Sequence, residues 1–210
     1  MENKAIKIYS YKRSGTHLLM KSLYDNFEIS DTALNIKSSN CNLHWYNQND
    51  KALNGVTVPW GKLFGSHSLP NKVNFNKQRS IYIFRSGIDV LWSNHRTFKI
   101  KKDFNDWITQ KVIENWMNHV IMWLQVGIYS IQFEELIQDF DKTIINIETK
   151  FKLKRKNLNF TKTDIIIGWS PGSGSVNGAI SQWNDENIKL YNEIVDLKYI
   201  QSLRKDNTNK

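Results

Sequence analysis

Residues 6–27, "IKIYSYKRSGTHLLMKSLYDNF", have the pattern of a short strand that turns into a helix at one glycine. Apolar residues first alternate, as in a buried strand, and after Gly15 they recur at helical spacing. This layout suits phosphate binding, because glycine allows close backbone approach and the N–H groups that begin a helix favour an anion. The Gly-Lys-Ser/Thr ending of the usual triphosphate-binding loop is missing. The pattern therefore predicts an anion site without identifying the anion.

Strand and helix patterns alternate along the rest of the chain. The continuous apolar run in "RSIYIFRSG", at 79–87, suits a central parallel strand that is covered on both faces. Other strands are predicted at 4–10 and 61–67, and helices at 16–27, 87–98, 106–125 and 184 to about 203. Residues 127–136 are predicted as a strand that leads to a helix, and 143–151 continue helically. The alternation predicts a three-layer α/β fold, in which helices flank a central, mostly parallel sheet. We expect a single domain over residues 1–210, with ligands at the carboxyl ends of the strands.

Composition and charge narrow the class of protein. Hydrophobic residues make up 40% of the chain, which argues against disorder, and the net charge of +9 favours anionic partners. The densest basic run, "KFKLKRK" at 150–156, is more typical of a solvated helix end or loop than of a nucleic-acid patch. The single cysteine, Cys41, cannot form an intrachain disulfide. No apolar run approaches the ~20 residues that span a bilayer, and the first residues lack a signal-peptide pattern, so we expect a cytoplasmic protein without a membrane span.

Cationic and hydroxyl side chains accompany the glycine turn. Lys12 and Arg13 add positive charge, and the fork of an arginine suits phosphate oxygens. Ser14 and Thr16 add hydroxyl donors. The alternative interpretation is a simple helix cap by Ser14 or Thr16, with both cations in solvent.

A second cationic position lies at the end of the predicted central strand. Arg85 follows a buried apolar run, where an unpaired guanidinium would be costly, so it should face an anion. Ser93 follows on the next predicted helix. The anion could be a ligand or, equally well, the carboxylate of Asp89 in a structural ion pair.

These segments together resemble the sulfotransferases that use 3′-phosphoadenosine 5′-phosphosulfate (PAPS). Arg13-Ser14-Gly15-Thr16 is similar to the loop with which that family grips the 5′-phosphosulfate, and Arg85 with Ser93 is similar to its pair on the 3′-phosphate. Three later segments, "SHSLP", "NWMNHVIMWL" and "IQFEELIQDF", resemble the family's Thr-His-Leu-Pro segment, its Trp-x-x-His-Val-x-x-Trp helix and its Tyr-Glu-Asp-Leu strand end, in that order. "GAISQW" resembles the family's Gly-x-x-Gly-x-Trp loop in part. The resemblance covers about residues 5–190.

The resemblance implies a P-loop-like form of the α/β fold and an enzyme of the EC 2.8.2 type. It would move the sulfuryl group of PAPS to a hydroxyl or amine of a small-molecule or carbohydrate acceptor, release 3′-phosphoadenosine 5′-phosphate (PAP), and need neither metal nor nucleic acid. His67 would be the general base, because an imidazole pKa lies near the working pH, and Arg13 would assist the transfer. A structural histidine is the alternative for His67. The implied cofactor-binding residues are Lys12, Arg13, Ser14, Gly15, Thr16, His17, Arg85, Ser93, Asn177 and Gly178.

Several positions depart from the family pattern. Arg13 stands where many members have lysine, and His17 replaces a small hydroxyl residue. Gly65 replaces a lysine that many cytosolic members carry before the Thr-His pair. The late loop has Val176-Asn177-Gly178 where many have Arg-Lys-Gly on the 3′-phosphate. This departure would weaken binding of the 3′-phosphate unless Ser175, Asn177, Arg96 or the basic residues 154–156 compensate for it.

Two other classes of function stay open at this point. A small-molecule kinase would share the fold, but the chain lacks the Gly-Lys-Ser/Thr ending and an obvious aspartate for Mg²⁺. A non-catalytic module that binds polyanions would account for the charge, but the basic residues do not alternate with aromatic ones on one face. Residues 28–60 and 97–106 are expected to shape the acceptor pocket, because they lie between the cofactor segments. His119 is expected to be packed in the helix over 106–125.

Overall fold

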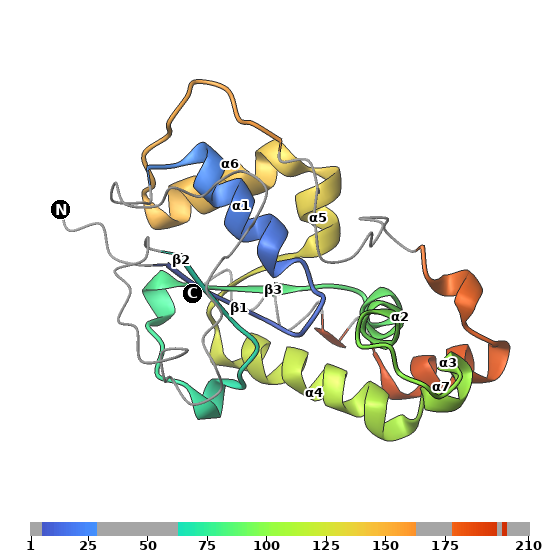
Figure 1. Ribbon diagram of the computed structural model, residues 1–210. Helices are drawn as coiled ribbons and strands as arrows, with labels where there is room; N and C mark the ends of the chain where they lie inside the picture. The colour runs from blue at the N-terminus through green and yellow to red at the C-terminus, as the bar shows by residue number, and fades with distance from the viewer. Residues whose placement is uncertain (1–5, 29–62, 163–177, 197–198, 201–210) are drawn as a thin grey trace.

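The computed structural model describes residues 6–28, 63–162, 178–196 and 199–200. Its centre is a parallel four-stranded sheet with the strand order β2-β1-β3-β4 (Figure 1). The strands are β1 (Ile6–Ser10), β2 (Leu63–Ser66), β3 (Ser80–Phe84) and β4 (Tyr129–Gln132). The helices are α1 (Thr16–Asn26), α2 (Gly87–Thr97), α3 (Phe104–Trp107), α4 (Gln110–Val126), α5 (Phe133–Gln138), α6 (Phe140–Phe151) and α7 (Asp185–Ile194), and short 3₁₀ turns include Pro70–Lys72, Lys77–Arg79 and Ile180–Gln182.

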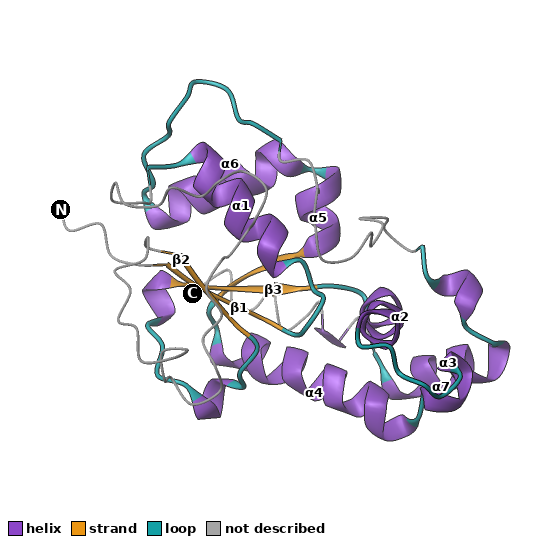
Figure 2. Cartoon of the chain, in the orientation of Figure 1, coloured by secondary structure: helices purple, strands orange, loops and turns teal. Residues whose placement is uncertain are grey.

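Helices cover both faces of the sheet, which confirms the predicted three-layer α/β fold (Figure 2). Successive side chains of a strand point to opposite faces, so Ile81 and Ile83 of β3 pack with α1, α5 and α6. Tyr82 and Phe84 pack on the other face, with α2, α4 and α7. All five residues of β3 are buried, as expected for a central parallel strand.

The strand order has a switch point between β1 and β3, where the direction in which strands are added to the sheet reverses. After β1 the next strand along the chain, β2, lies on one side, whereas after β3 the next strand, β4, lies on the other. Open parallel sheets bind ligands outside the carboxyl ends of the strands at such a point. The loop at Tyr11–Gly15 and the residues Arg85 and Ser86 therefore lie where a ligand is expected.

The predicted single helix over 106–125 is wrong at its start. Trp107 belongs to the short α3, and α4 begins at Gln110. The chain is extended at Ile108 and Thr109, and the Thr109 side chain accepts a hydrogen bond from the Val112 N–H as the cap of α4. A hydroxyl cap after β-branched residues explains the break.

Two other helices also differ from the prediction. The helical stretch expected after the fourth strand is two helices, α5 and α6, which Asp139 separates. The last predicted helix was expected to continue to residue 203, but α7 ends at Ile194, where Val195 becomes extended. Patterns in sequence show helix interiors better than helix ends, because the ends depend on single capping contacts.

Candidate functional site

The loop between β1 and α1 is held in a strained shape. Arg13 and Gly15 both have positive φ, 69° and 95°. A methyl group on Gly15 would lie 2.3 Å from Cδ2 of Phe133, the first residue of α5. Only a residue without a side chain fits this position, because the backbone of the loop lies directly against the Phe133 ring.

The hydroxyl groups of the loop do not cap α1. The N-cap residue is Gly15, no side chain of the described residues caps the helix, and its first turn has no acidic residue. Thr16 Oγ1 instead forms a short hydrogen bond with Ser10 Oγ. Ser14 Oγ is buried and has no hydrogen-bond partner among the described residues. The simple-cap interpretation is therefore wrong for this loop.

Two arginines and a serine from distant segments meet beside this loop. Arg13 Nε donates a hydrogen bond of 3.0 Å to Ser93 Oγ on α2. Burial and, second, the charge of Arg85 lower the pKa of Arg13. The structure thus brings together Arg13, Ser93 and Arg85, as their place at one sheet edge predicts. Two neighbouring, partly desolvated cations favour an anion between them.

Arg85 itself is buried, with 8% of its surface exposed. Its guanidinium lies over the ring of Phe133, 4.5 Å from the centroid, and its Nη2 lies 3.3 Å from Oδ2 of Asp89. The ion pair considered from the sequence is therefore present. It does not exclude a ligand, because a guanidinium can face a carboxylate with one edge and an oxyanion with another.

Asp89 also connects α2 to the late loop. Its Oδ1 accepts a hydrogen bond of 3.0 Å from the N–H of Ala179. This contact places Gly178, the preceding residue, close to Arg85 in space. Asn177 lies outside the described residues.

Two other predicted cofactor-binding residues lie in the loop. Lys12 is exposed, and its Nζ lies 5.2 Å from the ring centroid of Phe98, just after α2. His17 is in the first turn of α1. Lys12 thus joins the loop to the segment over 97–106 that was expected to border the acceptor.

His67 follows the last residue of β2, next to the end of β1. Its Nδ1 lies 2.9 Å from the carbonyl oxygen of Ser10 and 3.1 Å from Ser10 Oγ. A carbonyl oxygen can only accept, so Nδ1 carries the hydrogen and the basic lone pair lies on Nε2. The ring is half-buried, and Ser10 links it to Thr16 of the glycine loop.

No metal site is found near these residues in the part of the chain that the structure describes, since no group of three or more His, Cys, Asp or Glu side chains could hold an ion. None of the described helices is both long and apolar enough to cross a membrane.

Comparison with known proteins identifies the family. Residues 3–162 match the family described as "Sulfotransferase domain". The chain belongs to this sulfotransferase family. A solved structure of mouse sulfotransferase SULT7A1, described as complexed with PAP, has the same fold, with a TM-score of 0.70 and 14% identity. The match covers 100% of this chain and 90% of the mouse chain. No curated protein matches the sequence.

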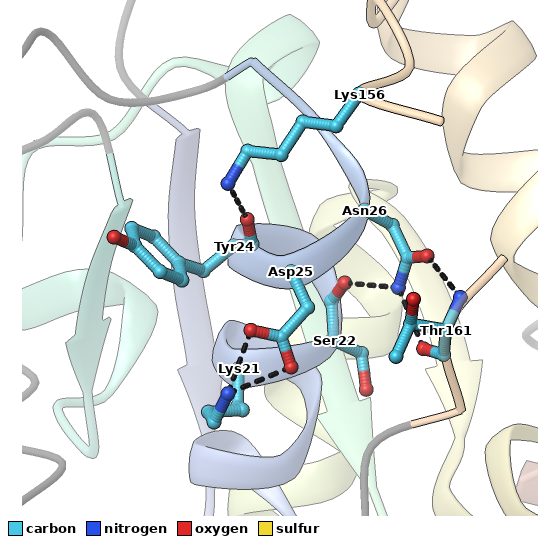
Figure 3. Close-up of polar contacts among 7 residues, drawn as sticks. All are labelled: Lys21, Ser22, Tyr24, Asp25, Asn26, Lys156 and Thr161. Carbon is cyan, nitrogen blue, oxygen red and sulfur yellow. Dashed lines mark hydrogen bonds and ion pairs between the residues drawn. The ribbon is translucent and has the colours of Figure 1, made fainter. Parts of the chain in front are cut away.

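One expectation about the sulfotransferase is corrected by the structure. The basic residues 154–156 lie at the C-terminal end of α1, whereas the glycine loop lies at its N-terminal end. Figure 3 shows the hydrogen bond that Lys156 Nζ donates to the carbonyl oxygen of Tyr24, in the last turns of that helix. Arg155 pairs with Glu148 at 2.6 Å, and Lys154 pairs with Glu28 at 2.9 Å. This run stabilises the chain near α1 and does not compensate for Val176-Asn177.

Helix α4 holds the chain at His67, a role that was not predicted from the sequence. His119 is packed, as predicted, but its Nε2 also lies 3.2 Å from the His67 carbonyl oxygen. Trp123 Nε1 donates to the carbonyl oxygen of Ser68 at 3.0 Å. The spacing of His119 and Trp123, four residues apart on one helical face, was the signal that could have suggested a common task.

Proposed function

We propose that this sulfotransferase uses PAPS as the sulfuryl donor, that His67 is the general base, and that residues 1–210 form one domain. The observation that carries the proposal is the meeting of Arg13, Arg85 and Ser93 beside a glycine loop whose Ser14 hydroxyl is buried without a partner among the described residues. Two cationic groups and a row of N–H donors fit a ligand that carries several anionic groups.

The 5′-phosphosulfate and the 3′-phosphate of PAPS would be bound by different groups of side chains. The loop over 12–16 and the start of α1 would hold the 5′-phosphosulfate, with Arg13 close to the bond that breaks. Arg85, Ser93 and Gly178 would hold the 3′-phosphate. The hydrogen bond between Arg13 and Ser93 supports this division, because it brings the two subsites within one side-chain length.

The transfer itself needs a base and a stabilised leaving group. The acceptor oxygen or nitrogen attacks sulfur, the bond from sulfur to the 5′-phosphate oxygen breaks, and the acceptor proton moves to Nε2 of His67. Arg13 and the N–H groups of α1 stabilise the charge that develops on the departing phosphate. The products are the sulfated acceptor and PAP.

Binding of PAP tests the donor assignment. We expect isothermal titration to show binding to the full chain and a loss of about tenfold or more in Arg85→Ala, because hydrogen bonds to charged groups contribute about 1.5–3 kcal/mol. Ser93→Ala keeps the ion pair of Arg85, so it covers the case in which Arg85→Ala does not fold. Arg155→Ala is the matched control, since Arg155 lies at the other end of α1. Absence of binding, or unaltered binding in both site variants, would overturn the assignment.

Titrations with other ligands distinguish the two alternative functions. A kinase would bind ATP in preference to PAP and would need Mg²⁺ for transfer. A polyanion-binding module would bind oligonucleotides with a steep dependence on salt and would not turn over. The cytoplasmic location stays a prediction from the sequence.

A further inference from the structure

Helix α4 holds the chain at the end of β2 with two hydrogen bonds to backbone carbonyl groups. His119 Nε2 lies 3.2 Å from the His67 oxygen, and Trp123 Nε1 lies 3.0 Å from the Ser68 oxygen. Both oxygens belong to the segment that carries the proposed base. The position of the His67 backbone therefore depends on side chains of α4, which packs on the face of the sheet opposite α1.

The other nitrogen of the His119 ring has its own partner. Nδ1 lies 3.0 Å from the hydroxyl oxygen of Tyr82, a fully buried residue of β3. Because the His67 carbonyl oxygen can only accept, Nε2 of His119 must carry the hydrogen. Nδ1 is then the acceptor, and the Tyr82 O–H is the donor.

The surroundings of His119 keep its ring neutral. Burial lowers its pKa to about 4, so the ring carries one hydrogen at neutral pH. A neutral imidazole has two tautomers, and the hydrogen bond at one nitrogen selects the state of the other. The edge of Tyr11, the residue that follows β1, also packs against this ring at 5.3 Å between centroids.

We propose that Tyr82 and His119 form a relay that positions His67: the Tyr82 hydroxyl holds the orientation of the His119 ring by donating to Nδ1, and His119 Nε2–H fixes the His67 backbone. Both are positioning residues, because both are buried and act on the His67 backbone rather than on the reacting atoms. The proposal rests on the proposed function of His67 as the base.

The relay predicts that removal of one hydroxyl group, that of Tyr82, affects turnover although it lies away from the reacting atoms. Without the Tyr82 hydroxyl, the buried His119 ring loses one of the two hydrogen bonds that fix its orientation. The bond from Nε2–H would then hold the His67 backbone less firmly, while the ring of His67 stays attached to Ser10 of β1. The direction of the basic Nε2 atom of His67 would change. This matters because a general base acts only within narrow limits of distance and angle.

Tyr82→Phe in the full chain is the central experiment. Nitrogen NMR of histidine rings should show Nε2 protonated in His119 of both proteins, with an Nδ1 signal that shifts in the variant because its hydrogen-bond donor is gone. Sulfate transfer from PAPS, measured with the fastest acceptor from a screen of phenols, sugars and amines, should fall about fivefold in kcat, the worth of one hydrogen bond. PAP affinity should not change. Tyr24→Phe, a tyrosine of α1 far from His67, is the control and should change neither signal.

Variants at His119 test the second step. His119→Leu removes the donor and should lower kcat about 100-fold, the loss expected from a base that is misplaced by about 1 Å. His119→Gln keeps an N–H at a similar distance and should recover part of that loss. A purely structural role would give equal losses in the two variants and would overturn the relay.

Two failures can be told apart. If Tyr82→Phe leaves the His119 Nδ1 signal or kcat unchanged, the relay is wrong while the function of His67 stands. If His67→Ala keeps full turnover, the base assignment is wrong, and the relay falls with it even where the NMR signals of His119 behave as expected.

Discussion

Gly15 shows how closely one residue can connect stability and binding. Its φ of 95° is unfavourable for any side chain, and its missing side chain leaves the space that the Phe133 ring fills. The same Phe133 ring lies under the guanidinium of Arg85. One aromatic ring therefore supports the glycine loop and the second cationic position together.

We expect Gly15→Ala to weaken both folding and nucleotide binding. The left-handed backbone alone should lower the free energy of unfolding by about 1–2 kcal/mol, and the clash with Phe133 should displace the loop. PAP affinity should fall about tenfold or more, because the loop N–H groups no longer converge on one phosphate. Gly127→Ala is the control: Gly127 also has positive φ, 73°, but ends α4. It should lose stability alone, and equal binding losses in both variants would contradict this explanation.

His67 should separate binding from turnover. His67→Ala is expected to bind PAP as the wild type does, because the proposed phosphate ligands are other residues. Its kcat should fall about 10²–10⁴-fold, the usual contribution of a general base. Titration calorimetry and transfer of labelled sulfate from PAPS measure the two quantities. Undiminished turnover would show that another residue is the base.

At the scale of elements, α1 is held at both ends by different means. Its N-terminus faces the proposed phosphosulfate, and its C-terminus is joined to the segment over 152–162 (Figure 3). Asn26 makes the central contacts there: its amide nitrogen donates to the carbonyl oxygens of Ser22 and Thr161, and its amide oxygen accepts from the Thr161 N–H. These bonds fix the direction of the helix and so the place of its N–H groups.

Asn26→Ala should destabilise the protein without changing the chemistry of the site. The buried Ser22 carbonyl oxygen and the more exposed backbone groups of Thr161 would lose their partner, at a cost of about 1–3 kcal/mol in the free energy of unfolding. Lys21→Ala removes the partly exposed pair with Asp25 and should cost less than about 1 kcal/mol. Denaturant unfolding measures both values. A loss in Asn26→Ala no larger than that in Lys21→Ala would contradict the central role of Asn26.

The elements themselves were mostly predictable, and their ends were not. Apolar periodicity indicated β1, β3, α1 and α4, because burial on one face leaves a local pattern. The break between α3 and α4 depends on the side chain of Thr109, and the end of α7 at Ile194 has no marker in the sequence. Such ends follow from single contacts that periodicity does not record.

For the whole molecule, the distribution of charge matters more than its total. The net charge is +9, yet the basic residues fall into groups with different tasks. Arg13 and Arg85 gather at the glycine loop, while Lys154, Arg155 and Lys156 are engaged at the far end of α1. A helix of 11 residues separates the groups by roughly 16 Å, more than the screening length of about 8 Å at physiological salt.

This separation predicts which cations the nucleotide senses. The double variant Lys154→Ala with Lys156→Ala should bind PAP with nearly unchanged affinity at physiological salt, although it loses two positive charges. Arg13→Ala loses one charge and should weaken binding about tenfold or more. Titrations at equal ionic strength measure both. Similar losses in the two proteins would show that the overall field, rather than the local contacts, holds the nucleotide.

The sequence alone indicated the α/β class, the order of the main elements and the identity of the charged residues at the strand ends, because periodicity and turn residues act locally. It left open whether Ser14 caps a helix and whether Arg85 pairs with Asp89 or a ligand. Those answers depend on strand order and packing, which bring Arg13 to Ser93, 80 residues away, and His119 to His67, 52 residues away. No local pattern specifies contacts over such separations, since they arise only when the sheet and its two helical layers assemble.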